Sequence, residues 1–345
     1  MNTDKRTGWG GPPVVAPGLA DFRSAARLMS RVAVRTPLVP LHSYGAGTEI
    51  WLKPETLQPI GSFKLRGVYN WAARLSPRQR SRGLSTTSSG NTAQALGYVA
   101  RLFGVSARTL VPEWLPDNKT QAIVNYGVTP VRVTLDDLLA YMLEERWKEE
   151  PYTYLNPWGD PGMIAGHGTI GLEILEDDPD VETVYVPVGG GALVCGIGAA
   201  LKALKPGIRV IGVQGQSNPS LAAAFRAGGP LWIEHRPTVC EGASIPVVVA
   251  EMYPLLRELV DDVALVPEEG VKAAIRRLAL RNKLVAEGAG AESLAAALAT
   301  PLQERGRTVC VISGGSISAE LLMTILAEDT DRPQGSPHPG NATEG

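Results

Sequence analysis

Residues 184–194 read V-Y-V-P-V-G-G-G-A-L-V. The first five are apolar and rich in valine, which is typical of a buried strand. Three consecutive glycines follow, and small residues suited to a helix come after them. Each glycine destabilises a regular element by roughly 0.5–1 kcal/mol, so the run indicates a backbone that curls closely around something. A strand, a glycine turn and a helix in this order predict one unit of a parallel sheet.

The same alternation continues along the chain. Further strands are predicted near Ile50, Leu110, Val131, Val210 and Val311, and helices begin near Asn91 and Val271. Strands and helices that alternate predict an α/β protein whose parallel sheets are covered by helices on both faces. In such folds ligands bind beyond the carboxyl ends of the strands, where loops lead into helices.

The composition describes a soluble chain of two domains. The 345 residues are 44% hydrophobic and 20% charged, and the formal net charge of -2 argues against nucleic acid or an anionic membrane as a partner. Cys195, Cys240 and Cys310 have neither metal-site nor disulfide spacing, which fits a reducing cytoplasm. The N-terminus lacks a signal peptide, and no apolar run approaches the ~20 residues that span a bilayer. We therefore expect a cytoplasmic protein.

The glycine run at 189–191 is interpreted as a phosphate-binding loop. A dinucleotide fingerprint would need glycine at the sixth position, which is Val194, and the Gly-Lys-Ser/Thr of a Walker motif is absent. The loop therefore favours a smaller phosphorylated cofactor. A tight structural turn is the alternative.

A second loop, T-T-S-S-G-N-T-A-Q-A, covers residues 86–95. Ser88, Ser89 and Asn91 could each cap the following helix. Together with Gly90 they are more than a cap requires, and the N–H groups of a helix N-terminus also bind a carboxylate or a phosphate. Capping and anion binding both remain open for this loop.

Lys64 lies in the stretch I-G-S-F-K-L-R-G, residues 60–67, between apolar Phe63 and Leu65. A buried ammonium is costly unless it is paired or neutral. One interpretation is a lysine that extends from a helix start towards solvent. The other is a lysine whose amine is used chemically, for example in a Schiff base.

A third loop, V-I-S-G-G-S-I-S, covers residues 311–318 and places Ser313 at the end of an apolar strand. Ser313 could cap the next helix or present its hydroxyl to a ligand. An amine, an anion-binding loop, a phosphate loop and a hydroxyl suit one ligand in particular. Pyridoxal 5′-phosphate has a carbonyl, a phosphate and a ring nitrogen that require such groups.

The sequence resembles the fold type II pyridoxal-phosphate enzymes, specifically the serine/threonine dehydratase group, which also contains serine racemases. The resemblance covers roughly residues 20–328. The matching segments are L-K-P-E-T-L-Q-P-I-G-S-F-K-L-R-G (52–67), S-S-G-N-T-A-Q (88–94), G-G-G-A-L (189–193) and S-G-G (313–315), supported by R-T-P-L (35–38), A-G-H-G-T-I-G-L-E-I (165–174) and A-E-G-A-G-A (286–291).

The resemblance implies the tryptophan synthase β-like fold, with two open, twisted, mostly parallel sheets flanked by helices and the cofactor between two domains. Residues 18–80 and 162–328 would form the large cofactor-binding domain. Residues 81–161 would form a small mobile domain that closes over the substrate. The two ends, 1–17 and 329–345, hold few apolar side chains to bury and are predicted to be flexible.

The resemblance also assigns roles to individual residues. Lys64 would be the Schiff-base lysine and a catalytic residue together with Ser89. The other cofactor-binding residues would be Phe63 beside the ring, Asn91 at the 3-oxygen, Gly189, Gly190, Gly191, Ala192 and Leu193 at the phosphate, Glu287, and Ser313 at the pyridine nitrogen. The substrate carboxylate would lie among Ser62, Ser88, Ser89, Gly90 and Thr92.

The implied reaction is the β-elimination of water from a 3-hydroxy amino acid, such as L-threonine or L-serine, to a 2-oxo acid and ammonia. Lys64 would remove the Cα proton. A neutral hydroxyl at Ser313 should leave the ring nitrogen unprotonated, which favours a lyase over an aminotransferase. The alternatives are a racemase, in which Ser89 acts on the opposite face of Cα, a β-replacement synthase, a cofactor carrier, and a protein without cofactor.

Four positions depart from the pattern of the family. Thr92 stands where His is usual, Ala192 where a fourth Gly is common, and Ser316 where Asn is common. Thr92 and Ser316 leave the identity of the substrate open. Gln214 stands where members with a divalent-cation site have Glu, so we predict no metal there. The resemblance further implies a homodimer or a homotetramer.

Overall fold

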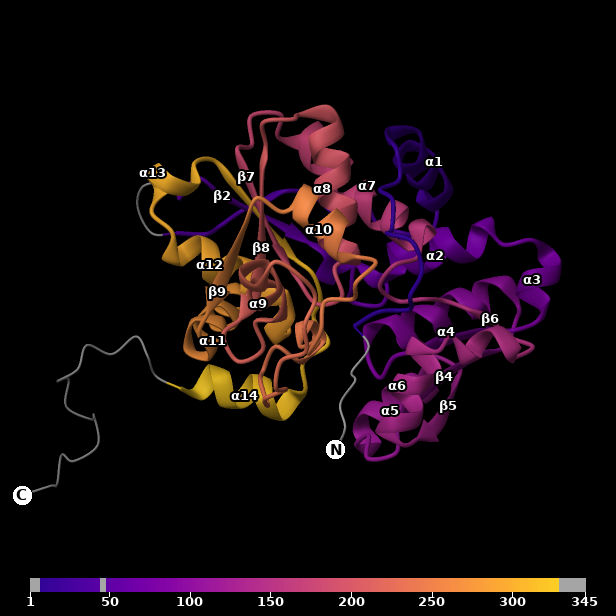
Figure 1. The fold of residues 1–345 in the computed structure, drawn as a ribbon. Helices are drawn as coiled ribbons and strands as arrows, with labels where there is room; N and C mark the ends of the chain where they lie inside the picture. The colour runs from indigo at the N-terminus through magenta and orange to yellow at the C-terminus, as the bar shows by residue number, and fades with distance from the viewer. Residues whose placement is uncertain (1–6, 44–47, 329–345) are drawn as a thin grey trace, which may run out of the picture.

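The computed structural model describes residues 7–43 and 48–328 of the chain. Its strands form two separate sheets, and helices lie on both sides of each (Figure 1). The predicted fold class, an α/β protein with two mostly parallel sheets flanked by helices, is confirmed.

The larger sheet has six strands in the order β1-β2-β10-β7-β8-β9. Their bounds are β1 Val39–Pro40, β2 Ile50–Pro54, β10 Thr308–Ile312, β7 Thr183–Pro187, β8 Arg209–Gly215 and β9 Asp262–Val266. Only β1 is antiparallel to its neighbour, and the other pairs are parallel. Every residue of β7 and of β10 is buried, as expected of central parallel strands covered on both faces.

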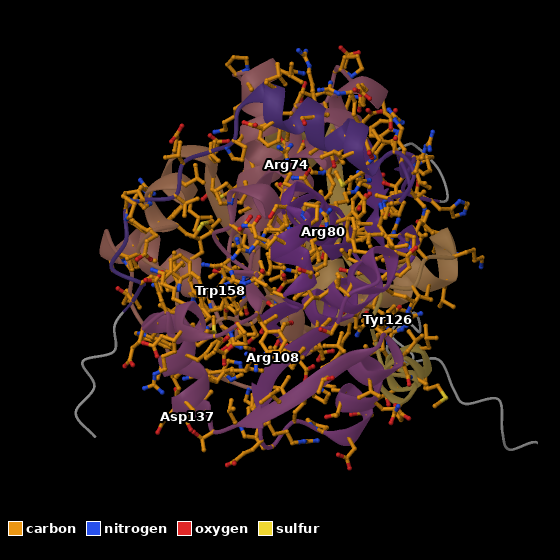
Figure 2. The ribbon with its side chains drawn as sticks, turned by 90° about the vertical axis from the view of Figure 1, so that its right-hand side faces the viewer. Arg74, Arg80, Arg108, Tyr126, Asp137 and Trp158 are labelled. Atoms are coloured by element: carbon orange, nitrogen blue, oxygen red, sulfur yellow. The ribbon has the colours of Figure 1, made fainter. Side chains whose placement is uncertain are left out.

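The smaller sheet has four parallel strands in the order β5-β4-β3-β6, seen from its own side in Figure 2. Their bounds are β3 Leu84–Thr87, β4 Ala107–Pro112, β5 Val128–Val133 and β6 Thr153–Tyr154. All four lie within residues 81–161, the range assigned above to the small domain. That this domain closes over a substrate stays a prediction.

The α-helices flank both sheets. They are α1 Leu19–Met29, α2 Lys64–Arg74, α3 Pro77–Ser81, α4 Asn91–Phe103, α5 Asp117–Asn125, α6 Leu135–Leu143, α7 Pro161–Asp177, α8 Ala192–Leu204, α9 Ser220–Ala227, α10 Tyr253–Leu259, α11 Glu268–Arg277, α12 Gly288–Ala299, α13 Leu302–Arg305 and α14 Ala319–Ala327. One apolar cluster joins α7, α8 and α10 to the sheet, and a second joins α11 and α12 to it. The core around the larger sheet is therefore formed by residues from both parts of the chain that flank residues 81–161, while a third cluster packs α2 and α4 against the smaller sheet.

The strand order brings the three loops picked out in the sequence to the carboxyl ends of parallel strands. The glycine loop follows β7, the loop of Ser313 follows β10, and the loop of Ser88 follows β3. In open parallel sheets this edge is where ligands bind. The topology thus directs all three loops towards one region between the sheets.

The predicted flexible ends lie mostly outside the described residues. Residues 7–17 are described, however, and they lie against the larger domain. The N–H of Ala250 donates to the carbonyl of Thr7, and the N–H of Val14 donates to the carbonyl of Glu251, both at 2.8 Å. A composition rich in Gly and Pro did not indicate this docking, because backbone hydrogen bonds need no apolar side chain.

Candidate active site

Lys64 is the first residue of α2 and is partly buried. Its Nζ lies 4.9 Å from the centre of the Phe63 ring. Burial lowers the pKa of Lys64 to about 8, although the nearby Glu287 carboxylate acts in the opposite direction. The amine is thus far easier to deprotonate than that of a lysine in water, which favours the chemical interpretation of this residue.

The lowered pKa of Lys64 predicts how its reactivity depends on pH. Only the neutral amine is nucleophilic, so a pKa of about 8 leaves about one amine in ten neutral at pH 7, against about three in ten thousand at the ordinary 10.5. In cofactor-free protein, acetylation of Lys64 should rise about tenfold per pH unit and level off above pH 8. Mass spectrometry that resolves each lysine measures the rate of acetylation at each pH, and a short peptide with one lysine serves as the reference. A half-maximum near pH 10.5 would contradict a desolvated Lys64.

The turn before Lys64 is hydrogen-bonded to the loop after β10. The N–H of Phe63 donates to the carbonyl of Ser313 at 3.0 Å, and the N–H of Gly315 donates to the carbonyl of Gly61 at 2.9 Å. Ser313 lies 249 positions after Lys64 in the chain, yet its carbonyl is bonded to the turn that precedes Lys64. The structure therefore brings the loop of Ser313 against the turn that leads into Lys64, two segments that the sequence picked out separately.

Asn91 and Glu287 form a second unit beside the first. Asn91 Nδ2 donates to Glu287 Oε1 at 2.9 Å, and Ser316 Oγ donates to Asn91 Oδ1 at 2.6 Å. The N–H of Glu287 donates to the carbonyl of Gly314 at 3.0 Å. Burial raises the pKa of Glu287 to about 7, against the opposing effects of Asn91 and Lys64. Near neutral pH this carboxyl can therefore hold or release a proton close to the amine.

The loop of Ser88, Ser89 and Gly90 leads from β3 into α4. The N–H of Ser88 donates to Thr109 Oγ1 at 3.0 Å, and the N–H of Gly90 donates to Ser88 Oγ at 3.2 Å. Gly90 is the N-cap residue and no side chain caps the helix, so the capping interpretation does not hold here. The first N–H groups of a helix have no intrahelical acceptor, and they favour an anion. Thr92 is buried within α4 at 4% exposure.

The glycine loop is closely packed on both sides. A Cβ on Gly190 would overlap the indole of Trp158, and a Cβ on Gly189 would lie 3.2 Å from Cα of Ala243. Gly191 has a backbone φ of +98°, a value that residues with a side chain rarely adopt. Gly190 and Gly191 are thus required by their surroundings, and a side chain at Gly189 would be tightly packed.

Ala192 and Leu193 begin α8, a helix of 13 residues. Its N-terminus carries a partial positive charge, and the N–H groups of its first turn have no acceptor within the helix. The loop and the helix start together form the kind of site that binds a phosphate.

Residues 239–244 take part in the site and were not predicted from the sequence. A Cβ on Gly242 would lie 3.5 Å from Glu287 Oε1, so this segment lies directly against the Asn91–Glu287 unit. Glu241 in the same segment forms an ion pair with Lys119 of α5 and so contacts the smaller domain. The only signal in the sequence was a glycine between Glu241 and Ala243, and single glycines are common in loops.

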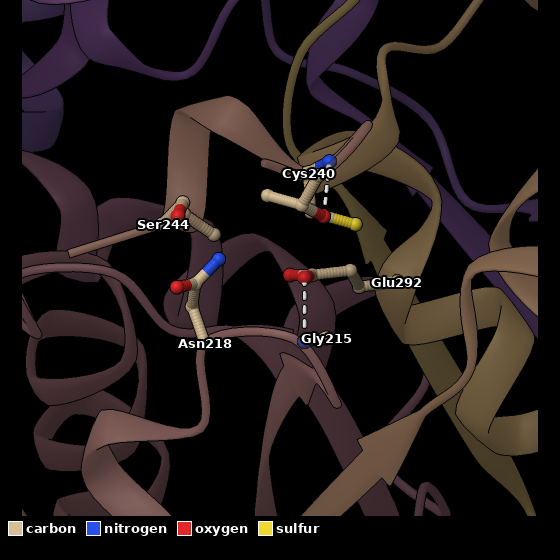
Figure 3. Close-up of a pocket in the computed structure, with 7 residues that line it drawn as sticks. Gly215, Asn218, Cys240, Ser244 and Glu292 are labelled. Atoms are coloured by element: carbon tan, nitrogen blue, oxygen red, sulfur yellow. Dashed lines mark hydrogen bonds between the residues drawn. The ribbon is translucent and has the colours of Figure 1, made fainter. Parts of the chain in front are cut away.

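A small cavity lies behind residues 239–244 (Figure 3). It is lined by Gly215, Asn218, Thr238, Cys240, Ala243, Ser244 and Glu292 and has a volume of about 10 Å³. Glu292 is 1% exposed and accepts a hydrogen bond from the N–H of Gly215 at 2.9 Å. Burial raises the pKa of Glu292 to about 8. The volume suits about one water molecule, so this cavity is too small to be the substrate site.

Gln214, the position of the family's divalent-cation site, has its side chain engaged within the protein. Its Nε2 donates to the carbonyl of Val188 at 3.1 Å and to Ser220 Oγ at 3.3 Å. Its Oε1 accepts from the N–H of Leu221 at 2.8 Å. No cluster of three or more His, Cys, Asp or Glu suited to a metal occurs within residues 7–43 and 48–328. That no metal binds stays a prediction.

His167 on α7 is a buried neighbour of the site that the sequence did not reveal. Its ring meets Phe63 edge to face with centres 4.8 Å apart, and it fills the space where a Cβ on Gly67 would lie. Burial and the nearby cations Lys64 and Arg66 hold the pKa of His167 well below its usual range. A neutral imidazole thus packs behind Phe63. In the sequence, His167 stood out only as part of the segment A-G-H-G-T, residues 165–169.

A buried ionic network holds α2 in place. Arg66, 2% exposed, donates to Glu55 Oε2 at 2.7 Å and to Glu173 Oε1 at 2.6 Å. Lys53 Nζ, also buried, donates to Glu173 Oε2 at 2.6 Å. Burial lowers the pKa of Arg66, but the two carboxylates outweigh it and hold the pKa above its ordinary value. The network joins β2, α2 and α7, and it fixes the helix that begins at Lys64.

Comparisons with known proteins agree with this arrangement. Residues 29–314 match the family described as pyridoxal-phosphate dependent enzyme. The L-threonine ammonia-lyase of Thermotoga maritima is 40% identical over 315 residues, which are 89% of this chain and 78% of that protein. The crystal structure of the T.th. threonine deaminase aligns with a TM-score of 0.80 at 34% identity, over 88% of this chain and 99% of that one. The structure of maize serine racemase aligns with a TM-score of 0.82 at 28% identity, over 90% and 97% of the two chains.

Proposed function

The chain belongs to the family of pyridoxal-phosphate dependent enzymes, and we propose that it removes water from a 3-hydroxy amino acid, L-threonine or L-serine, to give a 2-oxo acid and ammonia. The observation that carries the proposal is Lys64, an amine with a lowered pKa at the start of α2, directly after a turn that is hydrogen-bonded to the loop of Ser313. The similarity to an L-threonine ammonia-lyase over 89% of the chain supports the same reaction.

The residues of the site fit pyridoxal phosphate. The glycines at 189–191 leave bare backbone next to the N-terminus of α8, which suits a phosphate group. Lys64 offers an amine for the aldehyde, and Phe63 offers an apolar ring beside it. When bound, this cofactor withdraws electrons from the Cα of an amino acid and so weakens its Cα–H bond. The protein supplies position and proton transfer.

Proton transfer falls to Lys64 and its neighbours. With a pKa of about 8, the Nζ of Lys64 can take the Cα proton as a neutral amine near neutral pH. Electrons from the Cα–H bond form the new Cα–Cβ double bond, and the Cβ–O bond breaks as the hydroxyl leaves with a proton as water. Glu287, with a pKa of about 7, can hold a proton close by.

The loop after β3 is proposed to bind the substrate carboxylate. Ser88, Ser89 and Gly90 precede α4, and the uncapped N–H groups of that helix favour an anion at this point. We propose Ser62 and Thr92 as further contacts. Water that adds to the unsaturated product then releases ammonia and leaves the 2-oxo acid.

Racemisation is a second candidate function for the same site. The similarity to maize serine racemase, with a TM-score of 0.82, favours it. In this reading Ser89 exchanges a proton on the face of Cα opposite Lys64. Both reactions begin with the same proton transfer, so one chain can perform both.

The test is to incubate the purified protein with pyridoxal phosphate and L-threonine, L-serine or bulkier 3-hydroxy amino acids. We expect 2-oxo acid and ammonia in equal amounts from threonine or serine. Turnover of a bulkier substrate alone would replace threonine and serine as the proposed substrates. It would also assign the change in specificity to Thr92 and Ser316. D-amino acid without 2-oxo acid would favour the racemase. No product of either kind from any substrate, with the cofactor bound, would overturn the proposed elimination.

We further propose that the protein is a cytoplasmic homodimer or homotetramer. The family resemblance and the scattered cysteines support this proposal. Within the described part of the chain, no helix has the length and apolar character needed to cross a membrane.

A further inference from the structure

Residues 7–16, here called the N-terminal strap, wrap around a buried carboxylate. Glu251 is 4% exposed, and its Oε1 accepts a hydrogen bond from the N–H of Gly11 at 3.1 Å. Its carbonyl accepts from the N–H of Val14 at 2.8 Å. Gly8 is buried against it, since a Cβ there would overlap the Glu251 carboxylate. The strap thus follows a defined path on the larger domain.

This path carries Trp9 onto Trp158. The two indoles are stacked, with ring centres 6.5 Å apart and planes inclined by 29°. Trp9 also lies against Gly159. A Cβ added to Gly159 would be 3.1 Å from the Trp9 ring and 3.2 Å from Val14 Cγ2. Trp9, Val14 and Trp158 all join the apolar cluster around α8.

Trp158 in turn touches the glycine loop. It comes from the segment between β6 and α7, on the side of the molecule seen in Figure 2. Asn156 Oδ1 accepts hydrogen bonds from the N–H groups of Trp158 and Gly159, at 3.0 and 3.2 Å, and so fixes the backbone of this turn. The indole occupies the space where a Cβ on Gly190 would lie. The position of Gly190 is therefore limited by that of Trp158.

We propose that Trp9 and Trp158 are positioning residues for the cofactor: the N-terminal strap holds the Trp158 indole against Gly190 and thereby keeps the glycine loop in the shape that binds the phosphate of pyridoxal phosphate. The inference rests on the proposed function, because it takes residues 189–193 as the phosphate-binding loop. A bare glycine backbone is conformationally free. A rigid aromatic surface against it lowers the cost of ordering it when the anion binds.

The experiment measures the dissociation constant of pyridoxal phosphate from the cofactor-stripped full chain, by the absorption of the bound cofactor. Trp9→Ala removes the stack, and Gly8→Val lifts the strap through a different contact, the one with Glu251. Both should raise the dissociation constant by about three- to tenfold. Trp9→Phe keeps an aromatic ring on Trp158 and should stay within about twofold of the original.

Trp114→Ala is the matched control, since it removes a tryptophan that is 67% exposed and lies between β4 and α5, not in the strap. It should leave the dissociation constant unchanged, and circular dichroism should show that each variant is folded. A folded Trp9→Ala protein with an unchanged constant would overturn the role of the strap while the proposed function stood. Failure of the unaltered chain to bind the cofactor would instead reject the proposed function.

Discussion

Replacement of Lys64 by alanine is expected to lower kcat by at least about 10³-fold, the upper part of the range for loss of a positioned acid–base group. Both the amine that bonds the cofactor aldehyde and the base that takes the Cα proton disappear with it. The absorption band of lysine-bound pyridoxal phosphate should vanish as well. The measurement pairs an absorption spectrum with an assay of 2-oxo acid formed from threonine and serine.

Lys202→Ala provides the control for this substitution. Lys202 forms a surface ion pair with Asp261 at 2.7 Å, so its loss tests whether removal of any lysine affects turnover. Both the band and the activity should survive in this variant. Activity retained in Lys64→Ala would refute the assignment of the catalytic amine.

Replacement of Arg66 by methionine is expected to lower the free energy of unfolding by about 3–5 kcal/mol, the usual loss when one partner of a buried ion pair is removed. Methionine keeps an unbranched, mostly apolar stem but leaves Glu55, which is fully buried, without its main cation. The hydroxyl of Thr36, which donates to Glu55 at 2.8 Å, cannot neutralise that charge. Urea unfolding of the two proteins at pH 7 measures the difference.

Arg74→Met is the matched control on the same helix. Arg74, labelled in Figure 2, is exposed and bonds only to Asn70 among the contacts described, at 3.2 Å, so its loss should change stability by less than about 1 kcal/mol. If Arg66→Met and Arg74→Met unfold at the same urea concentration, the buried network does not stabilise the fold.

Lys64 and Arg66 lie two positions apart in α2 but have different roles. Lys64 at its start faces the site with a lowered pKa, while Arg66 within it is paired with Glu55 and Glu173 in the interior. The carboxylates that keep Arg66 charged lie on its side of the helix. Lys64 is left with the weaker influence of Glu287 and is therefore available as a base.

The amino-acid sequence alone determined the fold class and picked out most of the residues proposed for the site. A mostly apolar strand such as 183–187 strongly favours a buried parallel sheet. Three glycines directly after such a strand favour a close turn of the backbone. These signals are local, because each lies within about ten residues. The lysine between apolar neighbours was equally visible, and resemblance to a family gave it a role.

Only the tertiary structure decided which partners these residues have. Asn91 meets Glu287 across 196 positions of the chain, and the indole of Trp158, from the segment between β6 and α7, meets Gly190. The strap at residues 7–16 bonds to residues about 240 positions away through its backbone, which carries no sequence signal. That Gly90 rather than a serine occupies the N-cap position of α4 depended on the path of the chain after β3. Such contacts depend on how elements pack in space, and local propensity does not record that packing.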